Sequence, residues 1–330
     1  MQTFHVVEEF RPYHTEAPTK ATAVPSMMWI HEKSLLYWLA QDYFKGRGVI
    51  CDCGLFLGAS TRCFGEGLRD NPNLTTILAS RALPIRSYER GIVNPTMLKY
   101  FTRHEIGLQL NAGDSFAPIL RHFIEPVADL VDLHVGDILE EPVVAEPIEI
   151  LFLDVLKSPA IADFIVRSYF PKLIPGVSIV VQQDYFMPEL PFIKVLQEHF
   201  RARFDYCGEA GSSAIFRLRE AITQEQADHF VDNKPDGETQ LRLSSIAMQR
   251  SIDPYRRLFM ALSKARLMVG IHGADAAQKY LRQVAEDFPE LYDNANLLRL
   301  QAAIADVHSF IERWLPKSAR PPVALKDGSI

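Results

Sequence analysis

The sequence predicts an α/β protein with a doubly wound, mostly parallel sheet, and two observations point to this fold class. Short apolar segments alternate with segments of helical apolar spacing between residues 46 and 218, which is the pattern of βαβ units. At the end of this stretch, residues 204–207 and 213–218 flank a glycine-containing turn and predict an antiparallel hairpin. Right-handed crossovers then place helices on both faces of the sheet, and the hairpin closes one edge.

The individual elements follow from the same patterns, taken in chain order. Apolar runs next to glycine or turn residues predict five strands, at residues 49–53, 86–88, 130–135, 148–153 and 177–181. Helical spacing predicts helices at residues 60–68, 97–104, 116–127, 160–173 and 192–200, whereas residues 74–83 are ambiguous. Together with the hairpin, the strands make a seven-stranded Rossmann-like sheet with an antiparallel closing strand.

Three parts of the chain are expected. Residues 1–45 form an extended, proline-containing arm followed by a helix that begins near Ser26. Residues 46–218 form the α/β domain. Residues 219–330 form a helical extension, in which a polar linker and a poorly ordered tail flank helices at residues 253–268, 274–287 and 295–315. The linker covers residues 233–237, and the tail covers residues 316–330.

Composition and charge exclude several classes of protein. The 330 residues are 48% hydrophobic and 23% charged, which is typical of a globular protein and not of a disordered or fibrous one. With 35 Lys and Arg against 41 Asp and Glu, the net charge of −6 disfavours nucleic acid and anionic membranes as partners. No apolar run reaches about 18 residues and no signal-peptide pattern is present, so a cytoplasmic protein without a membrane span is expected.

The most informative segment follows the first predicted strand and covers residues 52–60. Asp52 ends the apolar run, and Gly54 and Gly58 follow it before a helix that begins near Ser60. Glycine permits backbone angles and close approaches that other residues do not, and a helix N-terminus favours an anionic group. Because ligands bind at this carboxyl edge in open α/β sheets, the segment predicts a ligand-binding turn. A tight turn without a ligand is the alternative.

The spacing of this segment differs from the G-x-G-x-x-G fingerprint of dinucleotide-binding proteins. It resembles instead motif I of class I S-adenosylmethionine (SAM)-dependent methyltransferases, more narrowly the catechol and macrocin O-methyltransferase branches, which use acid-x-Gly-x-x-x-Gly-x-Ser. The resemblance covers about half of the chain and implies that SAM is the cofactor. It assigns cofactor binding to Asp52, Gly54, Phe56, Gly58 and Ser60.

Two further acids fit this resemblance in chain order. Glu89 follows the second predicted strand, where the family has an acid that accepts hydrogen bonds from the ribose hydroxyls. Asp137 follows the third predicted strand, where the family contacts the adenine. The alternatives are a surface Glu89 paired with Arg86 or Arg90, and an Asp137 that only caps a turn.

The segment after the fourth predicted strand resembles the acceptor side of the same family. Asp154 and Lys157 match the Phe-Leu-Asp-x-x-Lys of catechol O-methyltransferases, in which the Asp is a metal ligand and the Lys is the general base. A lysine removes a hydroxyl proton only if burial or a neighbouring cation lowers its pKa. The alternative for Lys157 is an ion pair with Asp154 that positions the loop.

The residues that would complete a divalent metal site, such as one for Mg²⁺, follow the fifth predicted strand. Counting from Gly176 places Gln182 and Gln183 on the ligand pair of the family, and a slip of one residue places Asp184 on its second position. Neutral amides bind a hard cation less well than carboxylates do, so the sequence disfavours a family-type site. If such a site exists, its ligands are Asp154, Gln183 and Asp184.

Together, these features predict an O-methyltransferase that transfers a methyl group from SAM to a hydroxyl group of a small-molecule or glycan-like acceptor. The acceptor would meet Asp154, Lys157 and Asp184. Two alternatives stay open: an NAD(P)-dependent oxidoreductase, and a catalytically degenerate Rossmann-like protein that acts as a binding module. Gln182 and Gln183 are the feature in favour of the second alternative. The helical extension is a candidate surface for a homodimer.

Overall fold

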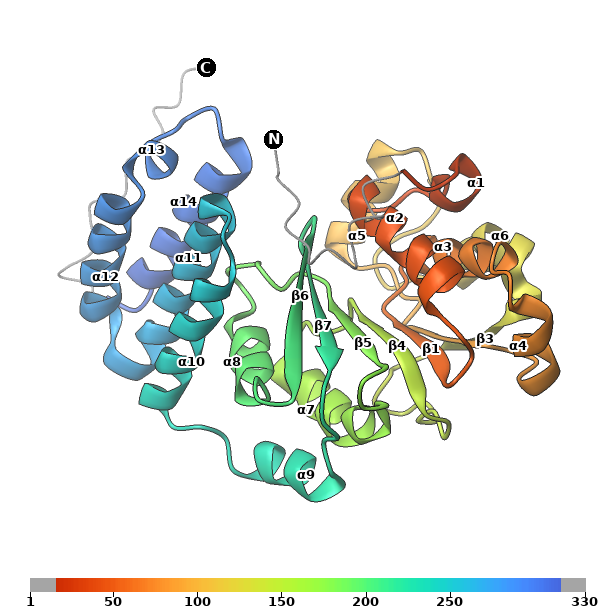
Figure 1. Ribbon diagram of the computed structural model, residues 1–330. Helices are drawn as coiled ribbons and strands as arrows, with labels where there is room; N and C mark the ends of the chain where they lie inside the picture. The colour runs from red at the N-terminus through yellow and green to blue at the C-terminus, as the bar shows by residue number, and fades with distance from the viewer. Residues whose placement is uncertain (1–15, 316–330) are drawn as a thin grey trace, which may run out of the picture. The chain divides into compact units, whose positions relative to one another are not determined.

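The computed structural model describes residues 16–315, which Figure 1 shows as a coloured ribbon. The predicted tail, and the predicted arm as far as residue 15, lie outside the described residues. The described chain divides into two compact units. The first runs to Tyr185 and resumes at His199–Lys234, and the second comprises Phe186–Glu198 and the residues from Pro235 onward. The junction near residue 234 falls in the predicted linker.

A seven-stranded sheet forms the centre of the first unit and confirms the predicted fold class. Its strands are β1 (Val49–Cys53), β2 (Ile85–Glu89), β3 (Val131–Val135), β4 (Ile148–Leu153), β5 (Ile179–Gln182), β6 (Phe204–Ala210) and β7 (Ser213–Leu218). They lie in the order β3-β2-β1-β4-β5-β7-β6, and β7 runs antiparallel to both of its neighbours. The strands β1, β4 and β7 have the predicted limits, and the limits of the others differ by one to three residues.

Helices cover both faces of this sheet (Figure 1). In the first unit they are α1 (Thr19–Thr22), α2 (Ile30–Trp38), α3 (Ala59–Arg69), α4 (Leu74–Ser80), α5 (Pro95–Arg103), α6 (Ala117–Ile124), α7 (Pro159–Ser168) and α9 (Gln224–Asp232). A π-helical turn, Leu39–Tyr43, continues α2, and 3-10 turns lie at Glu125–Leu130 and Phe170–Lys172. One turn of helix, α1, therefore lies in the segment expected to be extended, and α4 resolves the ambiguous residues 74–83.

The second unit consists of helices. They are α8 (Pro191–His199) without its last residue, α10 (Gly237–Arg250), α11 (Pro254–His272), α12 (Ala274–Asp287), α13 (Pro289–Tyr292) and α14 (Leu298–Glu312). Leu262, Leu281 and Val307 belong to a separate apolar core formed by α11, α12 and α14. The sequence does not predict α10, because polar residues interrupt its apolar spacing. No helix within residues 16–315 is long and apolar enough to cross a membrane.

Alternation along the strands decides which side chains point toward α2 and α3. Ile50 of β1, Phe152 of β4 and Val181 of β5 share one apolar core with residues of these helices. Because successive side chains alternate between the faces, Asp52 and Asp154, two residues beyond Ile50 and Phe152, continue on the same face. The fold thereby brings acidic side chains from separate strands to one face at the carboxyl edge of the sheet.

The packing of α2 on α3 depends on a glycine. A Cβ atom at Gly67 would lie 2.2 Å from the carbonyl oxygen of Tyr37, closer than any real Cβ contact. The two helices can therefore pack this closely only because residue 67 is glycine. In the first turn of α2, Glu32 accepts a hydrogen bond from Trp29 N at 2.8 Å. The position of Glu32 at the carboxyl edge thus depends on this packing of the two helices.

We expect Gly67→Ala to lower the stability of the first unit, because the new methyl group would collide with main chain that cannot move by itself. The expected loss in the free energy of unfolding is about 1–3 kcal/mol, measured by urea unfolding. Gly270→Ala in α11 is the control, since a Cβ atom there meets nothing within 4 Å and alanine favours a helix. A Gly67→Ala protein as stable as the wild type would contradict this account.

Candidate functional site

The carboxyl ends of the parallel strands form one edge of the sheet, along which the predicted site residues lie in spatial order. Asp137 follows β3, Glu89 ends β2, the turn at residues 54–58 follows β1, and Asp154 follows β4. Since the chain passes from β3 to the far side of β1, the topological switch point lies between β1 and β4. A Cβ atom at Gly54 would lie 2.8 Å from the carbonyl carbon of Asp154, so these two strand ends meet only because residue 54 is glycine.

The turn after β1 contains three residues in the left-handed region of backbone space. Gly54, Phe56 and Gly58 have φ angles of 90°, 51° and 94°. For a bulky residue such as Phe56 this conformation is strained. The ring of Phe56 packs on that of Phe101 at a centroid distance of 5.6 Å, and its N–H group donates to Glu89 Oε2 at 2.7 Å. Packing and a buried hydrogen bond therefore hold a strained turn in place, as is common at functional sites.

Asp52 and Ser60 are brought together by the fold, and they bond to each other. Asp52 is fully buried, and its carboxylate accepts hydrogen bonds from Ser60 Oγ at 2.8 Å and from Thr61 Oγ1 at 2.5 Å. Burial raises the pKa of Asp52 to about 7, although both hydroxyl groups oppose the shift. These side chains fix the first turn of α3, and cofactor binding by Asp52 and Ser60 stays a prediction.

Glu89 is buried, and both of its carboxylate oxygens accept hydrogen bonds from main-chain N–H groups. Oε2 accepts a hydrogen bond from Phe56 N at 2.7 Å, and Oε1 accepts one from Gly91 N at 3.1 Å. Burial raises the pKa of Glu89, and these backbone donors oppose the shift. Arg86, one of the two arginines considered as a partner of Glu89, pairs instead with Glu146. The main-chain N–H groups of Arg90 and Leu55 act on the same carboxylate, so the backbone uses most of its capacity for about four hydrogen bonds.

Asp137 lies next to Glu89 along the edge. Gly136 N donates to the carbonyl oxygen of Glu89 at 2.9 Å, which ties the loop after β3 to the end of β2. Asp137 Oδ1 accepts a hydrogen bond from Leu139 N at 3.1 Å, so this side chain does cap a turn. Contact of Asp137 with an adenine stays a prediction, and the second carboxylate oxygen is the one suited to it.

Lys157 joins two of the predicted acids into one cluster. Its Nζ lies 2.6 Å from Asp154 Oδ1 and 2.6 Å from Asp184 Oδ2. The ion pair with Asp154, which is the alternative role for Lys157, is therefore present, and Asp184 adds a second ion pair. Asp184 reaches this position with a φ angle of 59°, a conformation that aspartate adopts more readily than most residues.

The ionisation of this cluster favours a protonated lysine. Burial would lower the pKa of Lys157, but the charges of Asp154 and Asp184 outweigh that effect and raise it above its ordinary value. Burial raises the pKa of Asp154 to about 7, an effect that Asp184 and Glu32 increase and Lys157 opposes. In this arrangement Lys157 is a hydrogen-bond donor, and Asp154 is the group whose pKa suits a proton acceptor near neutrality.

A network that the sequence does not predict joins α2 to the turn between β6 and β7. Glu32 Oε1 accepts hydrogen bonds from Ser212 N at 3.1 Å, Ser212 Oγ at 2.9 Å and Ser213 Oγ at 2.7 Å. Gln183 Nε2 donates to Ser212 Oγ at 3.1 Å, which connects this network to the end of β5. Glu32 and Ser212 are 180 residues apart in the chain, so no local sequence pattern predicts that they pair.

The donor set at the ends of β4 and β5 fits a divalent metal poorly. Asp184 and Asp154 share Lys157 as a partner, and Gln182 is buried within β5. An ammonium group already lies between the two carboxylates, and the neighbouring Gln183 is neutral. Among residues 16–315, no three or more His, Cys, Asp or Glu side chains form a group that could hold a metal ion.

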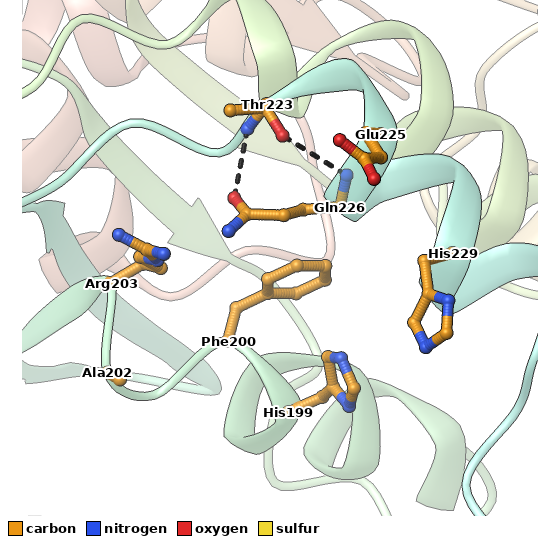
Figure 2. Close-up of a pocket in the computed structure, with 8 residues that line it drawn as sticks. All are labelled: His199, Phe200, Ala202, Arg203, Thr223, Glu225, Gln226 and His229. Carbon is orange, nitrogen blue, oxygen red and sulfur yellow. Dashed lines mark hydrogen bonds between the residues drawn. The ribbon is translucent and has the colours of Figure 1, made fainter.

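A pocket of about 550 Å³ lies at the opposite edge of the sheet (Figure 2). It is near the end of the hairpin where Phe204 pairs with Leu218, and the start of α9 forms one wall. Burial and the charges of neighbouring cationic groups lower the pKa of His199, so this imidazole is neutral at neutral pH. The residues that line the pocket, none of them predicted for the site, are His199, Phe200, Ala202, Arg203, Thr223, Glu225, Gln226 and His229.

We expect Asp52 to make the first unit less stable as the pH rises from about 4 to 7. Its folded pKa of about 7 exceeds the ordinary value of 3.8, so the unfolded state loses this proton first and is favoured as the pH rises. Asp52→Asn removes the ionisation, so its unfolding free energy relative to the wild type should rise by about 2–4 kcal/mol between pH 4 and 8. Urea unfolding across this range measures the difference, and a difference independent of pH would contradict the shift.

Among known proteins, no family model matches the chain, and no curated protein matches it. The functional interpretation therefore depends on the fold and on the geometry of the carboxyl edge.

Proposed function

We propose that the chain is a SAM-dependent methyltransferase that methylates a hydroxyl group of a small-molecule or glycan-like acceptor. The order of side chains along the carboxyl edge is the observation that carries this proposal. The groups assigned to the cofactor follow β1, β2 and β3, whereas Asp154, Lys157 and Asp184 follow β4 and β5. The two sets meet at Gly54, at the switch point, which is where a methyl donor and its acceptor must come together.

The cofactor half of the edge offers the contacts that SAM needs. Glu89 is the carboxylate assigned to the ribose hydroxyls, Asp137 lies beside it, and the turn at residues 54–58 follows on the side of the acceptor half. When bound, SAM supplies the methyl group: the acceptor oxygen bonds to the carbon as the carbon–sulfur bond breaks, and sulfur keeps the electron pair. Two carboxylates surround one ammonium group at the ends of β4 and β5, and the remaining negative charge favours the positive sulfonium.

The proton of the acceptor hydroxyl passes to Asp154 in this proposal. Its pKa of about 7 lets it accept a proton near neutral pH. Lys157, held as an ammonium by two carboxylates, donates a hydrogen bond that orients the acceptor oxygen. This assignment differs from the roles that the resemblance implies, in which the lysine is the base and the aspartate is a metal ligand.

A nicotinamide-dependent oxidoreductase is the second candidate, because a carboxylate at the end of β2 also suits the ribose of a dinucleotide. The turn after β1 favours SAM instead. It has two glycines, Gly54 and Gly58, in place of the three that bring a backbone close to a pyrophosphate. A cofactor titration therefore separates the two candidates.

We expect isothermal titration calorimetry to show that the wild type binds SAM and not NAD(P)H. Glu89→Gln should weaken SAM binding about tenfold, since an amide has one acceptor oxygen and no charge. Glu140→Gln, at an exposed position after β3, is the matched control and should bind SAM as the wild type does. Absence of SAM binding by the folded wild type would overturn the proposal, and binding of NAD(P)H would support the oxidoreductase.

We expect Lys157→Ala to lower kcat for methyl transfer at least about tenfold while SAM affinity changes less than about threefold. The reason is that Lys157 lies on the acceptor side of Gly54. Transfer of a radioactive methyl group from SAM to a panel of catechols, phenols and sugars gives the rates. Lys45→Ala, an exposed lysine before β1, is the control. Turnover that Lys157→Ala leaves unchanged would remove this residue from the mechanism.

A further inference from the structure

We infer that the ammonium group of Lys157 takes the place of a divalent cation in this chain, so that the acceptor side of the edge works without a metal ion. The inference deepens the proposed function and rests on it for the role of this edge. Two observations carry it. The ammonium group of Lys157 lies between Asp154 and Asp184, and Gln183, which follows β5, is neutral.

The ammonium group lies where a metal ion shared by two carboxylates would lie. Lys157 Nζ is 2.6 Å from both Asp154 Oδ1 and Asp184 Oδ2. Mg²⁺ binds carboxylate oxygens at about 2.0–2.1 Å and demands near-octahedral coordination, so the ammonium group would have to leave before the ion could bridge them. The left-handed backbone at Asp184 directs this carboxylate at Lys157. The end of β5 is therefore built to complete an ion pair.

The residue beside Asp184 adds no charge that would favour a metal ion over the ammonium group. Gln183 is neutral, and its Nε2 donates to Ser212 Oγ at 3.1 Å. Ser212 Oγ donates in turn to Glu32 Oε1 at 2.9 Å, so the network determines which way the amide points. Gln183 Oε1 is buried without a hydrogen-bond partner in the described part of the chain. Two carboxylates and one amide oxygen are a weak ligand set once an ammonium group offsets one of the two negative charges.

The replacement has a consequence for the acceptor. A lysine ammonium has three N–H donors, and Lys157 directs two of them at Asp154 and Asp184. The third donor serves one acceptor oxygen, whereas a metal ion can bind both oxygens of a vicinal diol. The site therefore selects its acceptor through a single hydroxyl group and does not require two neighbouring ones.

Manganese binding, followed by electron paramagnetic resonance, tests the inference without SAM or an acceptor. We expect the wild type to bind Mn²⁺ at least tenfold more weakly than Lys157→Met, which keeps an apolar stem and removes the charge. The double variant Lys157→Met/Asp184→Asn should lose this gain, because only one carboxylate remains. Lys157→Arg keeps a cation between the carboxylates and should exclude Mn²⁺ as the wild type does.

Wild-type protein that binds Mn²⁺ as tightly as Lys157→Met would overturn the inference. A folded Lys157→Met protein that gains no affinity would overturn it as well. If Lys157→Met does not fold, the wild type and Lys157→Arg still decide the question. A dissociation constant for Mn²⁺ below about 0.1 mM in either protein contradicts the replacement. Calorimetry with SAM is a separate measurement, so a protein that excludes Mn²⁺ and also fails to bind SAM would refute the proposed function alone.

Discussion

The close contact between Gly54 and the main chain of Asp154 is the constraint on which the carboxyl edge depends. β1 is hydrogen-bonded to β2 on one side and to β4 on the other, and its turn must leave the sheet between them. Gly54 N donates to the carbonyl oxygen of Tyr88, and Asp154 N donates to that of Cys53, both at 2.8 Å. A side chain at position 54 would push these strand ends apart. One residue therefore joins the part of the edge assigned to the cofactor to the part assigned to the acceptor.

The carboxylates of this edge differ in the groups that donate hydrogen bonds to them. This difference separates the carboxylates that hold the structure from the one suited to a reaction. Hydroxyl groups hold Asp52, main-chain N–H groups hold Glu89, and serines hold Glu32. These neutral donors stabilise a buried acid and keep the same form throughout a reaction. Asp154 instead faces the ammonium group of Lys157, a half-exposed side chain that can move and exchange partners. The interaction best able to change during a reaction is therefore the one at the end of β4.

The sequence predicts the fold and the acceptor acids for a physical reason, and it misses other residues for an equally physical one. Apolar runs define buried parallel strands, so the residues that follow each run must meet at one edge. Asp154 and Lys157 follow the fourth of these runs, where the resemblance to catechol O-methyltransferases singles them out. The choice between Gln182 and Asp184 needs the end of β5, which no count along the chain fixes. Glu32 is missed because its partners lie across a long stretch of chain, and only the packing of α2 brings them together.

The surroundings of Asp52 bear on the choice between the two cofactors. A dinucleotide places its pyrophosphate at the N-terminus of the helix after the first strand, where hydroxyl and N–H groups receive the negative charge. In this chain that helix is α3, and the hydroxyls of Ser60 and Thr61 in its first turn already donate to Asp52. With a pKa of about 7, Asp52 is ionised in part at neutral pH, and its ionised form opposes a pyrophosphate and favours a sulfonium. The same side chain that fixes the start of α3 therefore disfavours the anionic cofactor, which is a stronger physical argument than the spacing of the glycines.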